Sequence, residues 1–334
     1  MISDSQPRMR TDAIFGGAAD SSQFFLPRAR ERASRYGAIK LTELIQDHRR
    51  GELVPMPWPE LCGVQARLAP SPGIVVREGA VRLWKSERLV RRLFAHFELG
   101  TTEIGLEVRV SNPVAPGKGA ATSTVNMRLV AEAVAELYGL PLDARWLVRE
   151  LATIEATDAI IPDGRTCVWD FRRARQASPL YTLPPGVYLG VVPRAATLDT
   201  EALERKGRPR YTRAERASLS TAFTSIGAVL RRRDLERLAQ LATRSAEINH
   251  RYIPNPSVEA LETLRARGAI LGYAVAHSGT AALALAAPGT FVDSREALRE
   301  AFEGRDVELR GFEYRLEHDT LPFLIGAGRE LWRP

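Results

Sequence analysis

A glycine-rich stretch between Asn112 and Asn126, NPVAPGKGAATSTVN, contains residue types that bind phosphate groups. Gly117 and Gly119 carry no side chain, so backbone N–H groups there can approach an anion and the chain can adopt positive φ. Lys118, between them, could add a positive charge beside the same anion. The stretch therefore indicates an anion-binding loop, and a glycine turn that only caps a helix is the alternative.

Three hydroxyl residues follow the glycines, Thr122, Ser123 and Thr124, and apolar periodicity predicts a helix that begins at them and ends at Gly139. Free N–H groups and the helix dipole favour negative charge at a helix N-terminus, where hydroxyls can contact phosphate or Mg²⁺. Neither common glycine-rich template fits, because a glycine follows the lysine where Walker A needs Ser or Thr, and the dinucleotide fingerprint ends on a threonine. The residues point to a phosphate site of another kind.

Two carboxylates, Glu155 and Asp158, lie three residues apart at the end of a predicted helix that Asp143 caps. If the helix continues, the two side chains share one face. Each negative charge at a helix C-terminus costs a few tenths to about 1 kcal/mol, and a bound cation would offset this cost. A metal site is one interpretation of the pair, and two solvated acids are the other.

The composition is typical of a globular protein, with 334 residues of which 45% are hydrophobic and 26% charged. No stretch approaches the roughly 18 apolar residues of a membrane helix, and the polar N-terminus does not resemble a secretory signal. We therefore expect a cytoplasmic protein with no membrane partner. The net charge is +7, but the basic runs at 205–210 and 231–233 lack interleaved aromatic residues, so we expect solvated surfaces rather than a nucleic-acid site.

Strand and helix patterns intermix along the chain without a repeat of 20 to 50 residues, which is typical of an α+β fold. Residues 32–50 have the pattern of one or two helices. A polar connection from Arg194 to Tyr211 is the candidate boundary, so we expect an N-terminal domain at 1–190 that carries the phosphate loop and a C-terminal domain at 191–334.

The stretch PVAPGKGAATSTVN resembles the second motif of the GHMP kinases, which include galactokinase and the homoserine and mevalonate kinases. It is most similar to the loop of bacterial L-threonine kinases of cobalamin synthesis, Gly-Lys-Gly-Met-Ala-Ser-Ser-Thr-Ala-Asp. Six residues match that loop without a gap: Gly117, Lys118, Gly119, Ala121, Ser123 and Thr124. Thr122 replaces a serine and keeps the hydroxyl, whereas Asn126 replaces the aspartate.

Two further stretches resemble the L-threonine kinases. IEATDA (154–159) is similar to their Leu-Glu-Pro-Thr-Asp-Ser, and YAVAHSGT (273–280) is similar to Val-Ala-His-Ser-Gly-Ser. The resemblance, over roughly 52–330, implies the two-part GHMP kinase fold, with an N-terminal ribosomal-S5-like half and a C-terminal ferredoxin-like half. The N-terminus departs from the pattern, because the family motif Gly-Glu-Leu-Val-Gln-Gly is met only in part by residues 51–54, before Pro55. The acceptor therefore stays open.

The resemblance implies an ATP-dependent kinase of a small hydroxylated metabolite, with L-threonine or a related hydroxy amino acid as the first candidate. It implies Mg²⁺ ligation by Ser123 and Glu155, and Asp158 as the catalytic carboxylate that orients or deprotonates the acceptor hydroxyl. It implies ATP binding by Gly117, Lys118, Gly119, Ala120, Ala121, Thr122, Ser123 and Thr124. It implies acceptor binding by Asp158, His277, Ser278, Gly279 and Thr280, with a structural role as the alternative for the histidine. A homodimer, a different small alcohol as acceptor and a non-catalytic nucleotide-binding homologue stay open.

Overall fold

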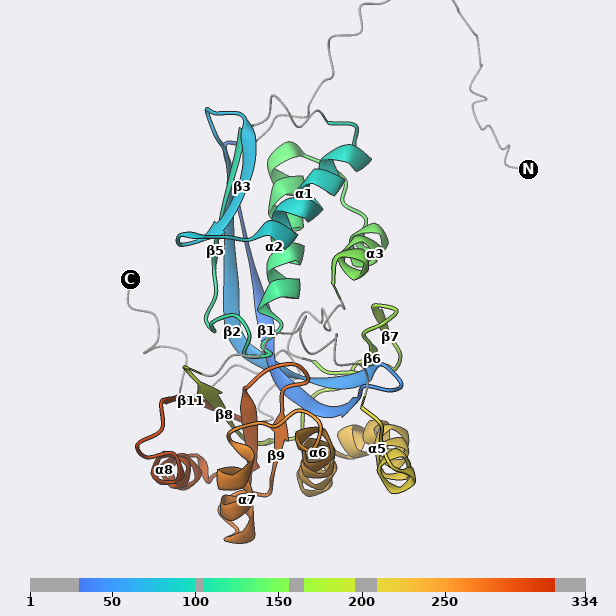
Figure 1. Cartoon of the computed structure of the whole chain (residues 1–334), viewed down its shortest axis with the longest axis vertical. Helices are drawn as coiled ribbons and strands as arrows, with labels where there is room; N and C mark the ends of the chain where they lie inside the picture. Colours follow the sequence, from blue (N-terminus) through green and yellow to red (C-terminus); the bar gives the residue numbers. More distant parts are fainter. Residues whose placement is uncertain (1–29, 100–104, 156–164, 196–208, 316–334) are drawn as a thin grey trace, which may run out of the picture.

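A long curled sheet with helices packed against it organises the computed structural model, which describes residues 30–99, 105–155, 165–195 and 209–315. In these residues the sheet has eleven strands in the order β11-β8-β10-β9-β1-β2-β5-β3-β4, and β6 and β7 join it through β2. Figure 1 shows helices α1 to α3 along the upper part of the sheet and α5 to α8 along the lower part. The expected α+β class is confirmed.

Among the described residues the upper part of the sheet is mainly antiparallel, and only β3 and β5 run parallel to each other there. Its strands are β1 (Arg32–Asp47), β2 (Glu52–Leu68), β3 (Gly73–Glu78), β4 (Val81–Arg82) and β5 (Gly105–Ser111). Its helices are α1 (Trp84–His96), α2 (Thr122–Tyr138) and α3 (Ala144–Ile154). Two of the predicted helix limits are confirmed: Gly139 ends α2 in a left-handed conformation, and the Asp143 side chain accepts from the N–H of Arg145 at the start of α3.

The lower part of the sheet is antiparallel throughout and carries four helices in the described residues. Its strands are β8 (Gly186–Pro193), β9 (Gly272–Val275), β10 (Ala282–Ala286) and β11 (Val307–Tyr314), with the short strands β6 (Trp169–Asp170) and β7 (Arg175–Gln176) beside β2. Its helices are α5 (Arg213–Arg232), α6 (Leu235–His250), α7 (Val258–Ala266) and α8 (Phe291–Ala301). No helix in the described ranges has the length and apolarity needed to span a bilayer.

Strand β1 joins the two parts of the sheet, and here the sequence prediction of helix over residues 32–50 is wrong. β1 pairs with β2 along almost its whole length and meets β9 at Glu43 opposite Val275. Residues 39–48 are all buried. A strand that is covered on both faces has no polar side, so its sequence lacks the alternation that marks a half-buried strand. The predicted domain boundary near residue 190 falls within β8, and the division at 190/191 remains a proposal.

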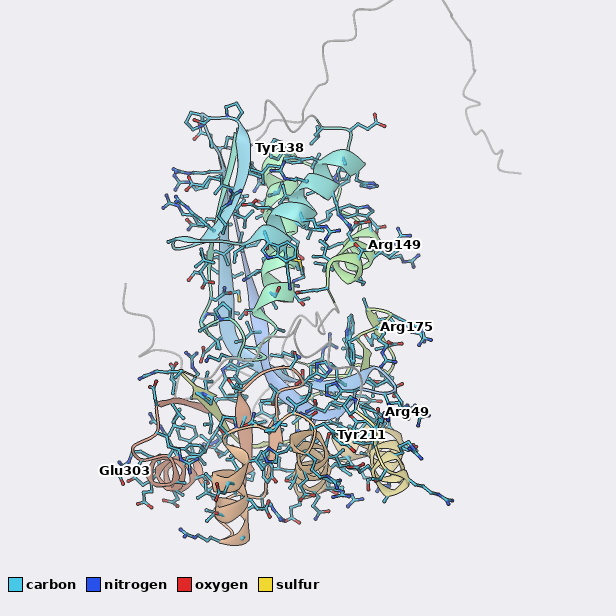
Figure 2. The ribbon with its side chains drawn as sticks, viewed as in Figure 1. Arg49, Tyr138, Arg149, Arg175, Tyr211 and Glu303 are labelled. Carbon is cyan, nitrogen blue, oxygen red and sulfur yellow. The ribbon has the colours of Figure 1, made fainter. Side chains whose placement is uncertain are left out.

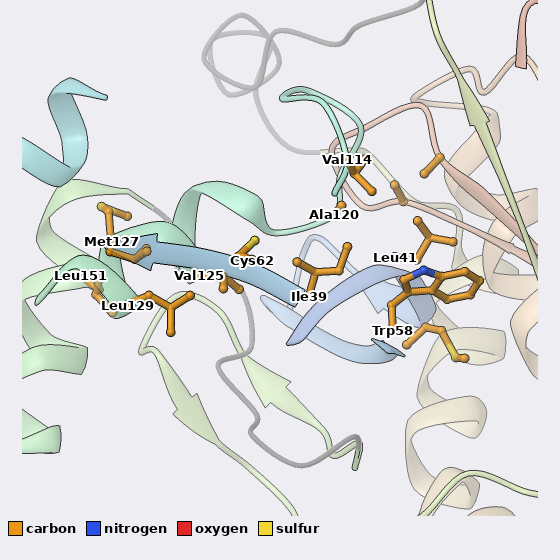
Figure 3. Close-up of a cluster of buried hydrophobic side chains, with 14 of the residues drawn as sticks. Ile39, Leu41, Trp58, Cys62, Val114, Ala120, Val125, Met127, Leu129 and Leu151 are labelled. Carbon is orange, nitrogen blue, oxygen red and sulfur yellow. The ribbon is translucent and has the colours of Figure 1, made fainter. Parts of the chain in front are cut away.

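Helix α2 is the central helix of the upper part and is buried along most of its length. Figure 3 shows Val125, Met127 and Leu129 of α2 in one apolar cluster with Ile39 of β1 and Cys62 of β2. Burial of this kind stabilises a fold by roughly 25 cal/mol per Å² of apolar surface removed from water. The core therefore fixes the N-terminus of α2, and with it the glycine-rich loop that precedes the helix.

Candidate active site

The loop between β5 and α2 has the backbone shape that its glycines predict. Gly117 and Gly119 have φ angles of 78° and 85°. Ala121, just before α2, also has a positive φ of 55°, a conformation that is uncommon for a residue with a Cβ atom. The first backbone bond of α2 runs from the N–H of Val125 to the carbonyl of Ala121 (3.0 Å), so residues 122–124 form the first helical turn. Their free N–H groups lie where the sequence predicts an anion.

The loop is in direct contact with the turn that follows β9, as the resemblance implies. The N–H of Ala281 donates to the carbonyl of Lys118 at 3.0 Å. Gly119 and Gly279 face each other so closely that a Cβ on Gly279 would lie within 3.0 Å of the Gly119 nitrogen. A Cβ on Gly119 would in turn lie within 3.0 Å of the Ala276 side chain. Both glycines are therefore required by the contact between the two segments, whatever the loop binds.

Lys118 does not project from the loop into solvent. Its side chain is buried, and its ammonium donates to the carbonyl of Arg194, just after β8, at 2.9 Å. Burial lowers the pKa of Lys118, and Asp306 opposes this shift. The lysine thus ties the loop to the lower part of the sheet, and its expected contact with phosphate remains a proposal.

Arg310 of β11 fixes the start of the same loop. Its guanidinium donates to the carbonyl of Pro113 at 2.7 Å and to the carboxylate of Glu308 at 2.7 Å, and it forms an ion pair with Glu60 of β2. Both members of the pair with Glu60 are largely buried. Three segments from the two parts of the sheet therefore meet at one guanidinium, which the sequence does not indicate because the partners are far apart along the chain.

Glu155 lies beside the first turn of α2, at the C-terminal end of α3. Its carboxylate accepts from the hydroxyl of Thr124 at 3.2 Å and from the ammonium of Lys85 at 2.7 Å. Ser123, the hydroxyl that the resemblance pairs with Glu155, is exposed at the adjacent position. Lys85 was missed, although it is one of only four lysines in the chain. Asp158 lies outside the described residues.

The donor set at Glu155 fits a magnesium ion that is bound together with a nucleotide. Within the described ranges, no group of three or more His, Cys, Asp or Glu side chains could hold a metal ion. Magnesium in nucleotide sites is commonly held by one or two carboxylates, while phosphates and waters complete the octahedron. One carboxylate and the neighbouring hydroxyls of Ser123 and Thr124 can therefore serve such an ion, but could not form a protein-only metal site.

The acceptor-side motif of the L-threonine kinases has a second match, which the sequence reading missed. The Glu-Leu-Val-Gln core of that motif is met by Glu43-Leu44-Ile45-Gln46, with Ile in place of Val. The carboxylate of Glu43 accepts from the backbone N–H of His277 and pairs with Lys40. Residues 51–54 match the motif more literally, but residues 43–46 lie in β1, where the sequence predicts a helix and the structure has a strand. This placement brings the first motif to the same turn as the third.

The ring of His277 lies between two other rings at the end of β9. It stacks on His48, with 4.2 Å between centroids, and meets Phe171 at 4.7 Å. Its Nε2 atom is buried and has no hydrogen-bond partner in the described part of the chain. The next residue, Ser278, is half-buried, and the carbonyl of Thr280 accepts from the Asn255 side chain at 3.1 Å. The turn therefore holds the predicted residues 277–280 together beside the phosphate loop.

Known proteins that are similar to this chain include kinases. No protein-family model matches the chain. Over 198 residues, 58% of this chain, it is 31% identical to an L-threonine kinase of Salmonella typhimurium and 28% identical to one of Citrobacter freundii. The match spans about two thirds of each relative, 65% and 67% of their lengths.

Solved structures of GHMP kinases have the same fold. A homoserine kinase from Cytophaga hutchinsonii superposes with a TM-score of 0.64 and 12% identity, over 87% of this chain and 96% of that one. A galactokinase from Lactococcus lactis gives a TM-score of 0.63 and 16% identity, over 85% and 94% of the two chains. The chain therefore has the fold of the GHMP kinases. In sequence it is similar to L-threonine kinases, so the resemblance expected from the three motifs is confirmed.

Proposed function

We propose that this protein is an ATP-dependent kinase that phosphorylates the hydroxyl of a small metabolite, with L-threonine or a related hydroxy amino acid as the first candidate acceptor. The observation that carries the proposal is the direct contact between the loop at 117–119 and the turn at 276–281, with Glu155 beside the same helix start. Phosphoryl transfer depends mainly on positioning and on charge stabilisation, and this arrangement can supply both.

The nucleotide phosphates would bind at residues 117–124, where the first turn of α2 offers free N–H groups and hydroxyls. Support for ATP and magnesium comes from a mevalonate diphosphate decarboxylase of the same fold that was solved with AMPPCP and magnesium (TM-score 0.60, 14% identity). Glu155 would hold Mg²⁺ together with Ser123 or Thr124, and the ion would neutralise charge on the phosphates. Lys85 would then have to leave Glu155 or share it.

The acceptor would bind on the β1 side of the turn, beside the place where Glu43 and His277 meet. Asp158 would orient the acceptor hydroxyl and accept its proton, and a weak base suffices for a loose phosphoryl-transfer transition state. The neutral backbone groups at 278–280 would close this side of the site. Two further proposals are not required by the acceptor chemistry. One is the division into domains at 1–190 and 191–334, and the other is a homodimer.

A screen for ADP release tests the proposal. The purified protein is incubated with ATP and Mg²⁺ and with L-threonine, L-serine, L-homoserine, amino alcohols and sugars in turn. We expect acceptor-dependent ADP release with at least one hydroxy amino acid. ADP release only with an amino alcohol or a sugar would support the alternative of a different acceptor. ATP binding without turnover on any acceptor would support a non-catalytic homologue, and absence of ATP binding would overturn the proposal.

Two substitutions separate the roles of the carboxylates. Asp158→Asn keeps the shape of the side chain but removes its basicity, so kcat should fall by roughly 10²- to 10⁴-fold while ATP affinity changes little. Glu155→Gln should instead raise the Mg²⁺ concentration needed for half-maximal rate, because a neutral amide is a poorer ligand for a hard cation. If Asp158→Asn keeps the kcat of the wild type, Asp158 is not the catalytic carboxylate.

A further inference from the structure

The backbone and ring of His277 are held from three sides. Its N–H donates to the carboxylate of Glu43, one face of its ring lies on His48, and Phe171 approaches at 58° to its plane. The stack with His48 is nearly parallel, with 16° between the planes. Aromatic contacts at such centroid distances contribute about 0.5–1.5 kcal/mol beyond the area that they bury. The fold therefore restricts the direction in which the imidazole edge points.

His48 is itself fixed by Asn249 of α6. The Nε2 atom of His48 lies 2.9 Å from the Oδ1 atom of Asn249. The amide nitrogen of the same asparagine donates to the carbonyl of Ala276 at 3.5 Å, which sets the orientation of the amide. The Oδ1 atom can only accept, so Nε2 of His48 carries the proton and donates it. A series of contacts therefore runs from Ala276, the residue before His277, through Asn249 to the ring of His48, on which the ring of His277 stacks.

The backbone of His48 is anchored at the side of α5. Its N–H donates to the hydroxyl of Tyr211 at 3.2 Å, and Figure 2 shows Tyr211 and Arg49, the residue after His48, beside that helix. The side chain of Arg172 donates to the carbonyl of His48 from the other side. His48 is therefore held at both its main chain and its ring, which makes it a rigid surface for the ring of His277.

These contacts hold the backbone N–H and the ring of His277, whereas its buried Nε2 atom has no hydrogen-bond partner in the described part of the chain. A buried polar atom that lacks a hydrogen bond costs roughly 1–3 kcal/mol, so such an atom needs a partner such as a ligand, an ion or a water. The turn that carries His277 also contacts the phosphate loop through Gly279. Nε2 is thus an available hydrogen-bonding atom next to the place where the acceptor would bind.

We propose that His48 is a positioning residue, which holds the ring of His277 by stacking so that its Nε2 atom meets a hydroxyl or another uncharged polar group of the acceptor. This inference rests on the proposed kinase function. The stacked face is the direct contact with His277, whereas the bond to Asn249 holds His48 in place. A planar ring without a donor at position 48 should therefore preserve more function than a donor without a ring.

Two variants of His48 test whether its ring face matters more for function than its hydrogen bond to Asn249. His48→Phe keeps the ring face and loses the donor to Asn249, whereas His48→Gln keeps a donor and loses the face. We expect His48→Gln to raise the KM for the acceptor by roughly five- to tenfold, the value of one hydrogen bond, with the KM for ATP unchanged. His48→Phe should raise it less than twofold. His96→Gln, which removes a ring stacked on Trp146 at 4.8 Å, is the matched control and should change neither KM.

A double-mutant cycle and a spectrum decide the outcome. His277→Ala should raise the acceptor KM as His48→Gln does, and the double variant should be no worse than His277→Ala, because both remove one interaction. Additive effects, or equal effects of the two His48 variants, would overturn the proposal. The ¹⁵N resonances of the His277 ring give a readout without turnover. We expect one set of ring shifts, from a single ring orientation, in the wild type and in His48→Phe, and averaged shifts in His48→Gln.

The same measurements separate this inference from the function on which it rests. If no acceptor is phosphorylated by the wild-type protein, the proposed function fails, and the ring spectra still show whether His48 fixes His277. If the wild-type protein is active and the spectra of His48→Gln and the wild type agree, the positioning role is wrong while the kinase function stands.

Discussion

Gly279→Ala tests the contact on which the candidate site depends. Gly279 faces the backbone of the phosphate loop, and its φ lies outside the positive region. Its missing side chain is therefore explained by space alone and not by backbone strain. A Cβ there would lie within 3.0 Å of three backbone atoms, the nitrogen of Gly119 and the carbonyl carbon and oxygen of Lys118, where ordinary contacts are 3.4–4 Å. Backbone atoms cannot rotate away as a flexible side chain can, so the two segments must move apart.

The required movement sets the expected size of the effect. Restoring an ordinary separation displaces the loop by about 1 Å, and a misplacement of this size can cost about 10² in rate. We therefore expect kcat/KM to fall about 100-fold, which corresponds to roughly 2.7 kcal/mol in the activation free energy. The affinity for ATP, measured by calorimetry, should fall in the same direction because the loop amides no longer converge on the phosphates.

The matched control is Gly268→Ala. Gly268 has a positive φ of 74° and no atom within 4 Å of its added Cβ, so this variant carries backbone strain without a new contact. It should lose about 1 kcal/mol of unfolding free energy and keep wild-type kinetics. Wild-type ATP affinity and kcat/KM in Gly279→Ala would refute the reasoning that the contact between the two segments forms the site.

Three further perturbations act on the surroundings of the site. Lys118→Met leaves the carbonyl of Arg194 without the donor from Lys118. The unfolding free energy, measured by urea titration without nucleotide, should therefore fall by about 1–3 kcal/mol. An unchanged value would contradict the structural role of Lys118. Arg310→Met should lower the unfolding free energy by about 2–3 kcal/mol, because Glu60 loses its ion-pair partner and the carbonyl of Pro113 loses its donor. This loss is smaller than that expected for a fully buried ion pair. A thermal unfolding curve that matches the wild type would contradict the prediction. Burial lowers the pKa of His48 from 6.5 to about 4, so only the unfolded chain takes up a proton on this ring as the pH falls from 7 to 5. The unfolding free energy should fall by about 2 kcal/mol over that interval from this residue, and His48→Phe should lose that part of the pH dependence.

The phosphate loop and its helix were predictable because the signals are local. Positive φ at Gly117 and Gly119 follows from the absence of a side chain, and the end of α2 at Gly139 follows from the same property. The contact between the loop and the turn at 276–281 was predictable only through the resemblance, because nothing in the residues themselves indicates which distant segment they meet.

Strand β1 and its motif could not be read from local pattern. Glu43, Leu44 and their neighbours have good helix propensity, but tertiary burial on both faces overrides that preference. The contact of Gly119 with Ala276 was not indicated by the sequence either, and the predicted binding of phosphate at Gly119 stays a prediction. Lys85 of α1 reaches Glu155 because α1 packs beside α3, and this packing could not be predicted from local sequence. The only signal at Lys85 was that the chain has just four lysines.

The pairing of β1 with β9 has a consequence for how the protein acquires its site during synthesis. The N–H of His277 bonds to Glu43, 234 residues earlier in the chain. A nascent chain that ends before β9 has already emerged with its phosphate loop, yet it lacks the turn against which that loop packs. Such distant contacts slow folding, because the long loop between them must close before either partner is stabilised. The glycine-rich loop should therefore remain exposed to proteases on the ribosome until the last fifth of the chain is made, and binding competence should appear late and all at once.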